Sequence, residues 1–293
     1  MSAAPPRDTA GFARSFSLEA TRPSAAEIAA LADIVPPATP VYFSAVPTVT
    51  PQEIVAAAAL LRKAGLEPVI HIAARRLASA TALRELLSGL RDEADVRRLL
   101  AVGGDVDAPG AFADALAVIQ KGRLRDAGIE EIGIGAYPEG HPRIPARHLE
   151  AALDEKIAAA TAQGLRVHII SQFSFSPERI LKWLRRVREG GIGKPIRIGM
   201  AGPSSVPALL RYAKRCGVAA SLRGLVSGVA GGLVGHAGPD RILETLSAAG
   251  DLSDLGDVAP HYFSFGGTLE TARYACEAAA GRHGASRAMA RTN

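Results

Sequence analysis

The stretch "EPVIHIAARRLASATALRELLSGLRDEADVRRLLAVGGD", residues 67–105, decides the fold. Two apolar runs, near 67–73 and 97–105, flank a segment of helical periodicity built from good helix formers. Apolar strands that alternate with amphipathic helices form a parallel sheet covered by helices. We therefore expect a strand, a helix and a second, parallel strand in this stretch.

The same pattern recurs along the whole chain. Strand-like runs lie near 12–20, 40–45, 67–73, 97–105, 130–138, 166–173, 196–202 and 261–267. Several helical segments between them open with Ser, Thr or Pro and close at Gly, as helix capping requires. Eight such repeats in 293 residues favour a closed (β/α)8 TIM barrel, an α/β fold, over an open doubly wound sheet. Residues 217–258 are expected to hold extra helices before the last strand.

No linker rich in proline or serine divides the chain. We expect residues 12–282 to form a single barrel domain with catalytic function, flanked by a flexible N-terminus over 1–11 and a flexible basic tail over 283–293. The sequence contains no run of 18 apolar residues and no apolar core of signal-peptide length. This predicts a cytoplasmic protein without a membrane partner.

Composition and spacing argue against several kinds of partner. The 34 Lys and Arg residues against 29 Asp and Glu give a formal charge of +5 without a basic block, which disfavours nucleic-acid binding. Cys216 and Cys276 have no Cys-x-x-Cys partner, so the sequence predicts neither a disulfide framework nor a zinc site. The prolines between His141 and His148 would break a helix carrying both rings, so no metal site is expected.

Polar residues follow most of the predicted strands. Chemistry in a (β/α)8 barrel sits at the carboxyl ends of the strands, so these residues are candidates for a site. They are Glu19, Ser44, His71, Asp105, Tyr137, Glu139, His141, Gln172 and Ser264. Each of these residues also has a purely structural interpretation, such as a hydrogen-bonded core histidine for His71 or a helix cap for Asp105. Their convergence on one barrel mouth favours an active site.

Other common site motifs are missing from the sequence. It has no Gly-x-x-x-x-Gly-Lys-Ser/Thr phosphate loop, no Gly-x-Ser-x-Gly nucleophile elbow and no His-Glu-x-x-His metal helix. "GIGAYP", residues 133–138, lacks the third glycine of the dinucleotide fingerprint and ends in a proline. We interpret it as the end of the fifth strand turning into the site.

Four stretches together resemble the methylenetetrahydrofolate reductase family. They are "FSLEATRPSAAEI" (16–28), "AVGGDVDAPGAFADAL" (101–116), "IGIGAYPEGHP" (132–142) and "IISQFSFSPERILKWLRRVREGGIGKPIRIGMAGPSS" (169–205). The Ala-Tyr-Pro-Glu-x-His-Pro string and the Gly-Asp after the fourth strand are the most specific parts. The likeness covers most of the chain.

The resemblance implies a flavoprotein oxidoreductase of one-carbon metabolism and methionine biosynthesis. Such an enzyme passes a hydride from NAD(P)H through FAD to 5,10-methylenetetrahydrofolate, giving 5-methyltetrahydrofolate. Carried over by motif, Glu19 protonates folate N10, Asp105 supports the cationic iminium form, and Gln172 positions the pterin. The flavin-contacting positions are His71, Gly104, Asp105, Ala136, Tyr137, His141 and Lys156.

The chemistry independently explains the need for two different carboxyl groups. Opening the folate ring leaves an iminium cation at N5, which an ionised carboxylate stabilises, while a second, neutral carboxyl group donates a proton. Burial keeps the second group protonated. Glu19 and Asp105 can divide these roles, and the amide of Gln172 can pair with a donor and an acceptor on the pterin edge.

The sequence departs from the family pattern at several binding positions. Gly103 stands where the family has an arginine that helps to hold the flavin, and Ala208 stands near a family glutamine. The family has a substrate-contacting arginine near the last strand, but here only Arg273 is present, one or two turns later. The helix between Lys156 and Gln172 is about a turn longer than in the family.

Two alternatives to the flavin-dependent reductase therefore stay open. One is direct hydride transfer from NAD(P)H to the folate without FAD. The other is a folate- or flavin-binding paralogue without reductase activity, acting in one-carbon or demethylation metabolism. In each case the expected partner is a tetrahydrofolate-type small molecule, and a homo-oligomer is left open.

Overall fold

The structure, a computed structural model, describes residues 9–44, 46–106, 110–218, 236–237, 239–248 and 255–282. Eight strands hydrogen-bond in the closed barrel order β1-β10-β7-β6-β5-β4-β3-β2. They are β1 (Ser17–Ala20), β2 (Pro40–Phe43), β3 (Glu67–Ala73), β4 (Arg98–Val102), β5 (Glu131–Ala136), β6 (Arg166–Ser171), β7 (Ile196–Ala201) and β10 (Val258–Phe263). The (β/α)8 barrel predicted from the sequence is confirmed.

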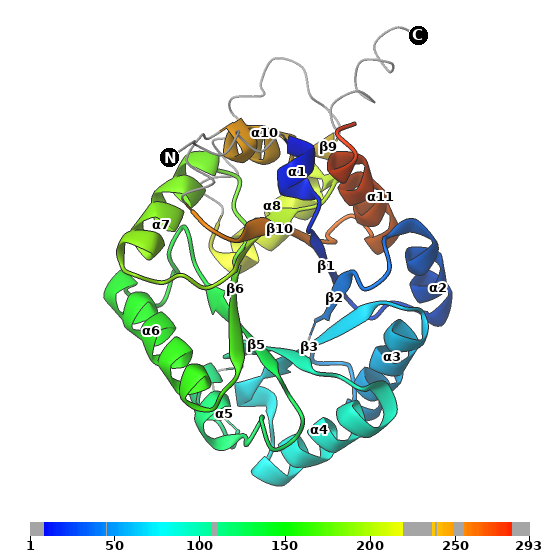
Figure 1. Cartoon of the computed structure of the whole chain (residues 1–293), viewed down its shortest axis with the longest axis vertical. Helices are drawn as coiled ribbons and strands as arrows, with labels where there is room; N and C mark the ends of the chain where they lie inside the picture. The colour runs from blue at the N-terminus through cyan, green and yellow to red at the C-terminus, as the bar shows by residue number, and fades with distance from the viewer. Residues whose placement is uncertain are drawn as a thin grey trace, which may run out of the picture. The chain divides into compact units, whose positions relative to one another are not determined.

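Helices connect the strands along the chain (Figure 1). The described helices are α1 (Thr9–Ala13), α2 (Ala25–Ile34), α3 (Pro51–Lys63), the 3-10 turn η1 (Ala74–Arg76), α4 (Ala80–Ala94), α5 (Ala115–Lys121), α6 (Ala146–Ala162), α7 (Pro177–Glu189), α8 (Val206–Cys216), α10 (Asp240–Ala248) and α11 (Thr268–Ala279). Two short antiparallel strands, β8 (Ser204–Ser205) and β9 (His236–Ala237), pair outside the barrel order.

The chain forms two compact units that alternate in sequence. The first unit comprises residues 1–18, 137–143 and 171–293, and the second comprises residues 19–136 and 144–170.

The second unit contains β2 to β5 and helices α2 to α6. Its parallel register pairs Tyr42 with Val69, Val69 with Arg98, and Arg98 with Glu131. Tyr42, Val69, Leu100 and Ile170 form a buried cluster between the strands. Figure 1 shows α3 and α4 side by side on the outer side of these strands, where they make extensive contact with each other.

Local sequence signals start the helices of the second unit. Ser24 and Thr50 cap α2 and α3 through capping boxes, in which each hydroxyl accepts the backbone N–H of a glutamate three residues later. Pro51 then occupies the first turn of α3, where its missing N–H costs no hydrogen bond. The left-handed Asp95 ends α4 and turns the chain toward β4.

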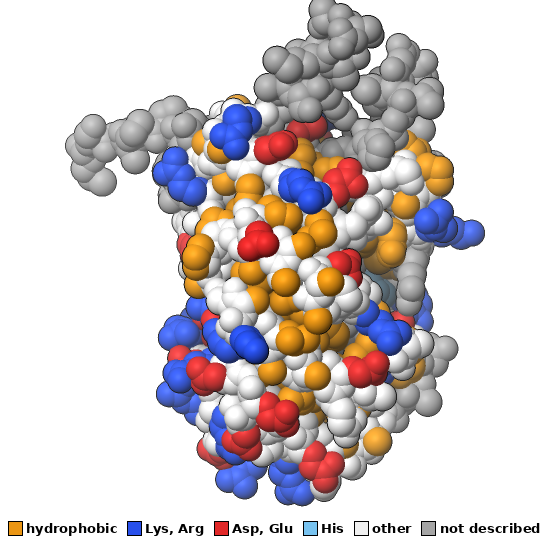
Figure 2. Space-filling model, turned by 90° about the vertical axis from the view of Figure 1, so that its right-hand side faces the viewer, with side chains coloured by type: hydrophobic (Ala, Val, Ile, Leu, Met, Phe, Trp, Pro, Cys, Tyr) orange, Lys and Arg blue, Asp and Glu red, His pale blue; other side chains and the backbone are white. Residues whose placement is uncertain are grey.

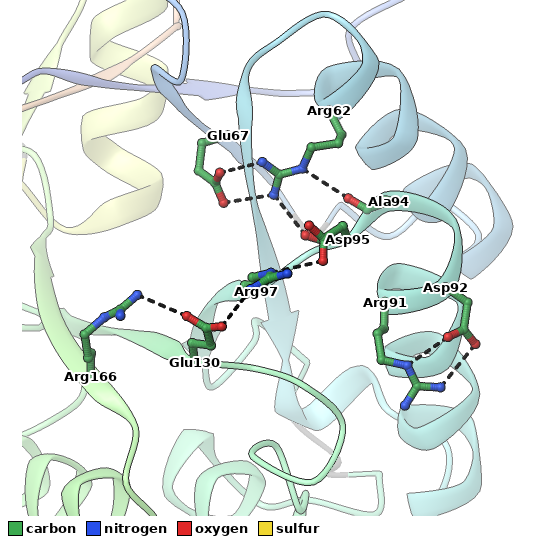
Figure 3. Close-up of polar contacts among 9 residues, drawn as sticks. All are labelled: Arg62, Glu67, Arg91, Asp92, Ala94, Asp95, Arg97, Glu130 and Arg166. Atoms are coloured by element: carbon green, nitrogen blue, oxygen red, sulfur yellow. Dashed lines mark hydrogen bonds and ion pairs between the residues drawn. The ribbon is translucent and has the colours of Figure 1, made fainter.

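Charged side chains gather at the amino ends of β3 to β6 (Figure 3). Arg62, at the end of α3, binds the Glu67 carboxylate with both guanidinium nitrogens, at 2.6 and 3.1 Å, and donates to two backbone carbonyls. The contacts continue from Asp95 to Arg97 at 3.0 Å, from Arg97 to Glu130 at 3.0 Å and from Glu130 to Arg166 at 3.5 Å. This end of a (β/α)8 barrel serves stability, and the ion pairs tie successive strands together.

The first unit packs its N-terminal helix against its last two helices. Helix α1 contacts α10, α11 and β10, and the ring of Phe16 meets Tyr262 edge to face at 6.2 Å. A separate buried cluster joins residues from the ends of β6 and β7 to α8. Its members are Phe173, Phe175, Ala201, Leu209, Ala213 and Val218.

The first and the last strand depart most from the sequence-based prediction. The run near 12–20 is a helix followed by a four-residue strand, because Phe12 and Ala13 are buried in α1 and not in the sheet. The last strand begins at Val258, three residues earlier than predicted. Helix α10 is an extra helix before the last strand, while residues 219–235, 238 and 249–254 of the predicted extra region lie outside the described residues.

The outer face of the second unit has two characters. Figure 2, which views the side that carries α2, α3 and α4, shows hydrophobic side chains across its middle and charges of both signs toward its upper and lower parts. The exposed positions of α2 and α3 include several alanines and Leu60, whereas those of α4 include Arg84, Glu85, Arg91 and Asp92. Among the described residues, no helix combines the length and apolar character needed to cross a membrane.

Candidate active site

The Glu19 carboxyl group is contacted on both of its oxygens. Its side chain is 15% exposed. Ser44 Oγ donates to Oε1 at 2.5 Å, and Thr21 Oγ1 in turn donates to Ser44 Oγ at 3.3 Å. On the other side, Oε2 lies 3.7 Å from Nε2 of His71, whose side chain is 10% exposed. Two predicted site residues, Glu19 and His71, are thus neighbours.

The strand register explains how these groups meet. Phe43 pairs with Ile70 between β2 and β3, so Ser44 and His71 each lie one residue further along their strands. The backbone N–H of Ser44 donates to the carbonyl of Ala20 at 3.1 Å, which holds the end of β2 beside the end of β1. Glu19, one residue before Ala20, is thereby placed next to both partners.

A buried polar group below His71 fixes the orientation of its ring. Tyr42 meets the His71 ring edge to face, with ring centres 6.1 Å apart, and its hydroxyl lies 2.7 Å from Nε2 of His168. Nδ1 of His168 lies 2.7 Å from the Glu131 carboxylate. The His168 hydrogen bond, with smaller effects from Arg98 and Arg166, lowers the pKa of Glu131 to about 2 against the opposing effect of burial.

Asp105 pairs with an arginine that sequence reasoning missed. Arg76 Nε lies 3.1 Å from Asp105 Oδ1, and the Arg76 Nη2 group contacts the same oxygen. The Asp105 side chain is 48% exposed, and that of Arg76 is 18% exposed. A guanidinium beside a carboxylate stabilises the ionised form, so this pair favours a negatively charged Asp105.

The glycines before Asp105 leave the backbone accessible. Gly104 has a φ of +92°, which glycine adopts without strain. Apart from its two chain neighbours, no described residue has an atom within 4 Å of a Cβ placed at Gly103. The carbonyl of Gly103 accepts the N–H of Arg75 at 3.0 Å, so the turn after β4 is bound to the turn after β3. Gly103 has no side chain, and the guanidinium beside Asp105 is that of Arg76.

The fifth strand ends in a tight turn, as interpreted from the sequence. Ala136 is buried at the end of β5, and the Gly140 N–H donates to the Tyr137 carbonyl at 3.0 Å, with Gly140 at a φ of +81°. The rings of Tyr137 and His141 meet edge to face at 5.3 Å. Burial raises the pKa of Tyr137 and lowers that of His141, so both rings favour their neutral forms.

The polar side chains that follow β6 form hydrogen bonds with groups of their own unit. The side-chain oxygen of Gln172 accepts the N–H of Phe173 at 3.0 Å, which fixes the amide next to the strand. Ser174 Oγ donates to Glu139 at 2.6 Å, and Arg179 lies 3.9 Å from the same carboxylate. Glu139 is therefore a buried acid bound to its own unit.

Three aromatic rings of the first unit form a stack that we call the aromatic stack: Tyr212, Phe265 and Phe263. Phe265 lies 4.1 Å from Tyr212 and 5.6 Å from Phe263, with interplanar angles of 15° and 19°. Phe173 meets Phe265 edge to face at 4.9 Å. The stack is partly exposed, and stacked rings of this kind offer a surface for a flat ligand ring.

Lys156 lies away from the strand ends. It is in the middle of α6, where burial lowers its pKa and the charge of Asp114 opposes that effect. Asp114 is also the N-cap of α5, accepting the Ala117 N–H at 2.8 Å. Among the described residues, no group of three or more His, Cys, Asp or Glu side chains is placed to bind a metal ion.

Some side chains of the candidate site had only weak signals in the sequence. The paired arginines directly after β3 could have indicated Arg76, because charged residues at strand ends are candidates. Tyr42 and His168 are 126 residues apart, and no local pattern joins them. The aromatic stack could have been suspected from "FSFGG", residues 263–267, which follows the last strand.

Comparison with known proteins identifies the family. The family model described as methylenetetrahydrofolate reductase matches residues 25–221. The 5,10-methylenetetrahydrofolate reductase of Pectobacterium carotovorum subsp. carotovorum is 29% identical over 152 residues, which are 52% of this chain and 49% of that protein. The chain thus spans about half the length of the curated relative that it matches.

Solved structures support the fold. A protein from Clostridium thermocellum that binds two copies of 5-methyl-5,6,7,8-tetrahydrofolic acid has a TM-score of 0.59 at 13% identity, over 92% of this chain and 94% of that chain. Dihydropteroate synthase from Thermus thermophilus has a TM-score of 0.51 at 16% identity, over 90% of this chain and 91% of that chain. With the family model matching most of its length, the chain belongs to the methylenetetrahydrofolate reductase family.

Proposed function

We propose that this protein reduces 5,10-methylenetetrahydrofolate to 5-methyltetrahydrofolate with NAD(P)H, with FAD as the bound cofactor. The observation that carries the proposal is the arrangement of Glu19, a shielded carboxyl group with Ser44 on one oxygen and His71 beside the other. Family membership supplies the substrate class. The folate-binding solved relative agrees with it, since its fold accommodates 5-methyltetrahydrofolate.

In this proposal Glu19 is the acid that opens the folate ring. Its proton passes to N10 as the carbon–nitrogen bond breaks, and the electron pair of that bond stays on N10. Positive charge then develops at the N5 iminium, and a carboxylate near it lowers the barrier. We assign that role to Asp105, whose ionised form Arg76 stabilises.

The residues of the second unit are compatible with a flavin. His71, Gly104 and Asp105 stand at or near the ends of the adjacent strands β3 and β4, and the glycine backbone there is accessible. Arg76 supplies a guanidinium that the missing arginine at position 103 would have supplied. The proposed flavin contacts in this unit are His71, Gly104, Asp105 and Ala136, while Lys156 lies apart from them in the middle of α6. Tyr137 and His141, which the sequence also predicts as flavin contacts, belong to the first unit. FAD, when bound, would accept a hydride from NAD(P)H and deliver it to the folate.

The first unit offers groups suited to the folate itself. We propose that the Gln172 amide binds the pterin edge and that the aromatic stack binds a flat ring of the substrate. Base-like rings gain about 1–3 kcal/mol from stacking on aromatic side chains. Ala208, which stands near the family glutamine, lies in the first turn of α8, and its methyl group offers no polar contact there.

A second candidate is direct hydride transfer from NAD(P)H without FAD. The observation that favours it is that Arg76 already binds Asp105, so its guanidinium is partly engaged before any flavin phosphate could use it. In this candidate Glu19 and Asp105 keep the same roles toward the folate.

The test is a titration of the purified protein with FAD, NADH or NADPH, and methylenetetrahydrofolate, followed by absorbance. Flavin bands that bleach with NAD(P)H and return with methylenetetrahydrofolate support the first proposal. A colourless protein that oxidises NAD(P)H only when the folate is present supports direct transfer. Binding of folate without oxidation of NAD(P)H, with or without added FAD, would overturn both and leave a binding protein.

A further inference from the structure

We propose that Glu19 and His71 hold one proton between them, and that this shared proton, on the carboxyl oxygen facing His71, is the one delivered to the substrate. The inference rests on the proposed function and deepens it. It makes His71 a positioning residue for the transferred proton, a role separate from the flavin contact expected at this position.

The hydrogen bonds decide which oxygen carries the proton. A serine hydroxyl has one proton to donate, and Ser44 directs its proton to Oε1 at 2.5 Å while it accepts from Thr21 at 3.3 Å. Oε1 is therefore an acceptor. A neutral Glu19 must then carry its own proton on Oε2, the oxygen that lies 3.7 Å from His71 Nε2.

The geometry suits proton exchange between Oε2 and Nε2. A hydrogen bond needs about 3 Å between these atoms, and catalytic hydrogen bonds that are long without substrate tighten when substrate binds. The edge contact with Tyr42 at 6.1 Å fixes the plane of the His71 ring. Tyr42 is held in turn by His168 at 2.7 Å, so the ring is oriented from the buried core.

Within the part of the chain that the structure describes, the polar and charged groups nearest His71 on the neighbouring elements can be named. The neighbouring strand β2 presents Tyr42 and Ser44, which are uncharged, and β4 pairs Leu100 with His71. The charged residues just beyond the strand ends, Arg76 and Asp105, form an ion pair with each other. Glu19, on β1, is the carboxyl group that lies beside the His71 ring.

The step balances in protons and electron pairs. The O–H bond at Oε2 breaks as an N–H bond forms at N10, and the electron pair of the broken carbon–nitrogen bond remains on N10. Glu19 is left as a carboxylate. His71 is neutral at this point, so it first takes up a proton from water at Nε2 and, as the imidazolium, passes that proton to Oε2, which restores the starting state.

The first experiment measures the pH profile of kcat for methylenetetrahydrofolate reduction in His71→Asn. Glutamate alone deprotonates at a pH about 2 units below histidine, so the alkaline limb should move down by about that amount and the activity at neutral pH should fall. In His71→Ala, added imidazole should restore activity at neutral pH. His148→Asn, which removes an exposed histidine, is the matched control. An unchanged alkaline limb in His71→Asn would overturn the proposal.

A second measurement is independent of catalysis. Histidine labelled with ¹⁵N reports the titration of His71, assigned through the His71→Asn spectrum. Sharing a proton with a carboxylate stabilises the imidazolium, so His71 should titrate at lower pH in Glu19→Gln than in the wild type. Equal titration in both proteins would overturn the inference. A wild type that shows the coupling but reduces no folate would instead overturn the proposed function alone.

Discussion

Glu19 differs from an ordinary strand-end acid because both of its oxygens have assigned partners. Replacing it with glutamine keeps the size and the contact with Ser44 but removes the transferable proton. Removal of a general acid typically costs about 10²- to 10⁴-fold in rate. We therefore expect Glu19→Gln to lose methylenetetrahydrofolate reduction by that factor while NAD(P)H oxidation by an artificial electron acceptor is retained.

The two half-reactions, measured separately by stopped-flow absorbance, check this expectation. Glu93→Gln removes an exposed acid on α4 and should change neither half-reaction. Equal loss of both half-reactions in Glu19→Gln would show that the residue supports the structure of the site and does not donate the proton.

Asp105 tests the role of the second carboxyl group. Asp105→Asn removes the negative charge that would face the iminium and also breaks the ion pair with Arg76. We expect the folate half-reaction to slow more than cofactor affinity declines, because charge stabilisation acts on the transition state. Flavin affinity by fluorescence titration and folate reduction by stopped flow give the two values. A larger loss of affinity than of rate would move Asp105 to cofactor binding.

At the residue scale, the sequence predicted which residue types stand at the candidate site better than it predicted their hydrogen-bond and ion-pair partners. Glu19, His71, Asp105 and Gln172 were predicted as site residues because polar residues follow apolar strands and match a family motif, and this role stays a prediction. Arg76 was missed because its partner is 29 residues away, at the end of another strand. The Tyr42–His168 contact spans 126 residues, and only the closed strand order brings it about.

At the scale of elements, strands in continuous apolar runs were predicted well. The bounds predicted for β3, residues 67–73, agree with the structure. The last strand was misplaced because Pro260 interrupts its apolar run, while Phe265 extends that run beyond the strand end. Phe265 lies beyond the strand, where its ring stacks on Tyr212. This is a tertiary contact, and the local sequence carries no sign of it.

The Tyr42–His168–Glu131 group joins three strands and gives a prediction for acid stability. The pKa of Glu131 is lowered from 4.5 to about 2, so its stabilising effect is complete above pH 4.5 and is lost as the pH falls toward 2. We expect Glu131→Gln to lower the free energy of unfolding at pH 7 by about 1–3 kcal/mol. The difference from wild type should shrink between pH 4.5 and 2.

Urea unfolding at a series of pH values measures this difference. The matched control is Glu130→Gln, which removes a more exposed acid that pairs with Arg97 and Arg166 and should cost less than about 1 kcal/mol. If Glu131→Gln lowers the free energy of unfolding equally at every pH, the hydrogen bond to His168 stabilises the fold and the charge of Glu131 does not.

At the scale of the whole molecule, the chain passes between its two compact units in the middle of strands. Ser17 and Leu18 of β1 belong to the first unit and Glu19 and Ala20 to the second, and β6 is divided before Ser171. Neither unit is one continuous segment of the chain, so neither is formed by a single stretch that could fold by itself. We therefore expect both units to unfold in one cooperative transition.

The single tryptophan makes this expectation testable. Trp183 is 5% exposed in α7 of the first unit, so its fluorescence follows that unit, whereas far-UV circular dichroism follows the helices of both. Coincident urea transitions from the two probes are the signature of two-state unfolding. A second circular dichroism transition without a fluorescence change would show that residues 19–136 and 144–170 unfold separately. In that case the acid group around Glu19 could be lost while the aromatic stack stays folded, and activity would follow the circular dichroism signal and not the fluorescence.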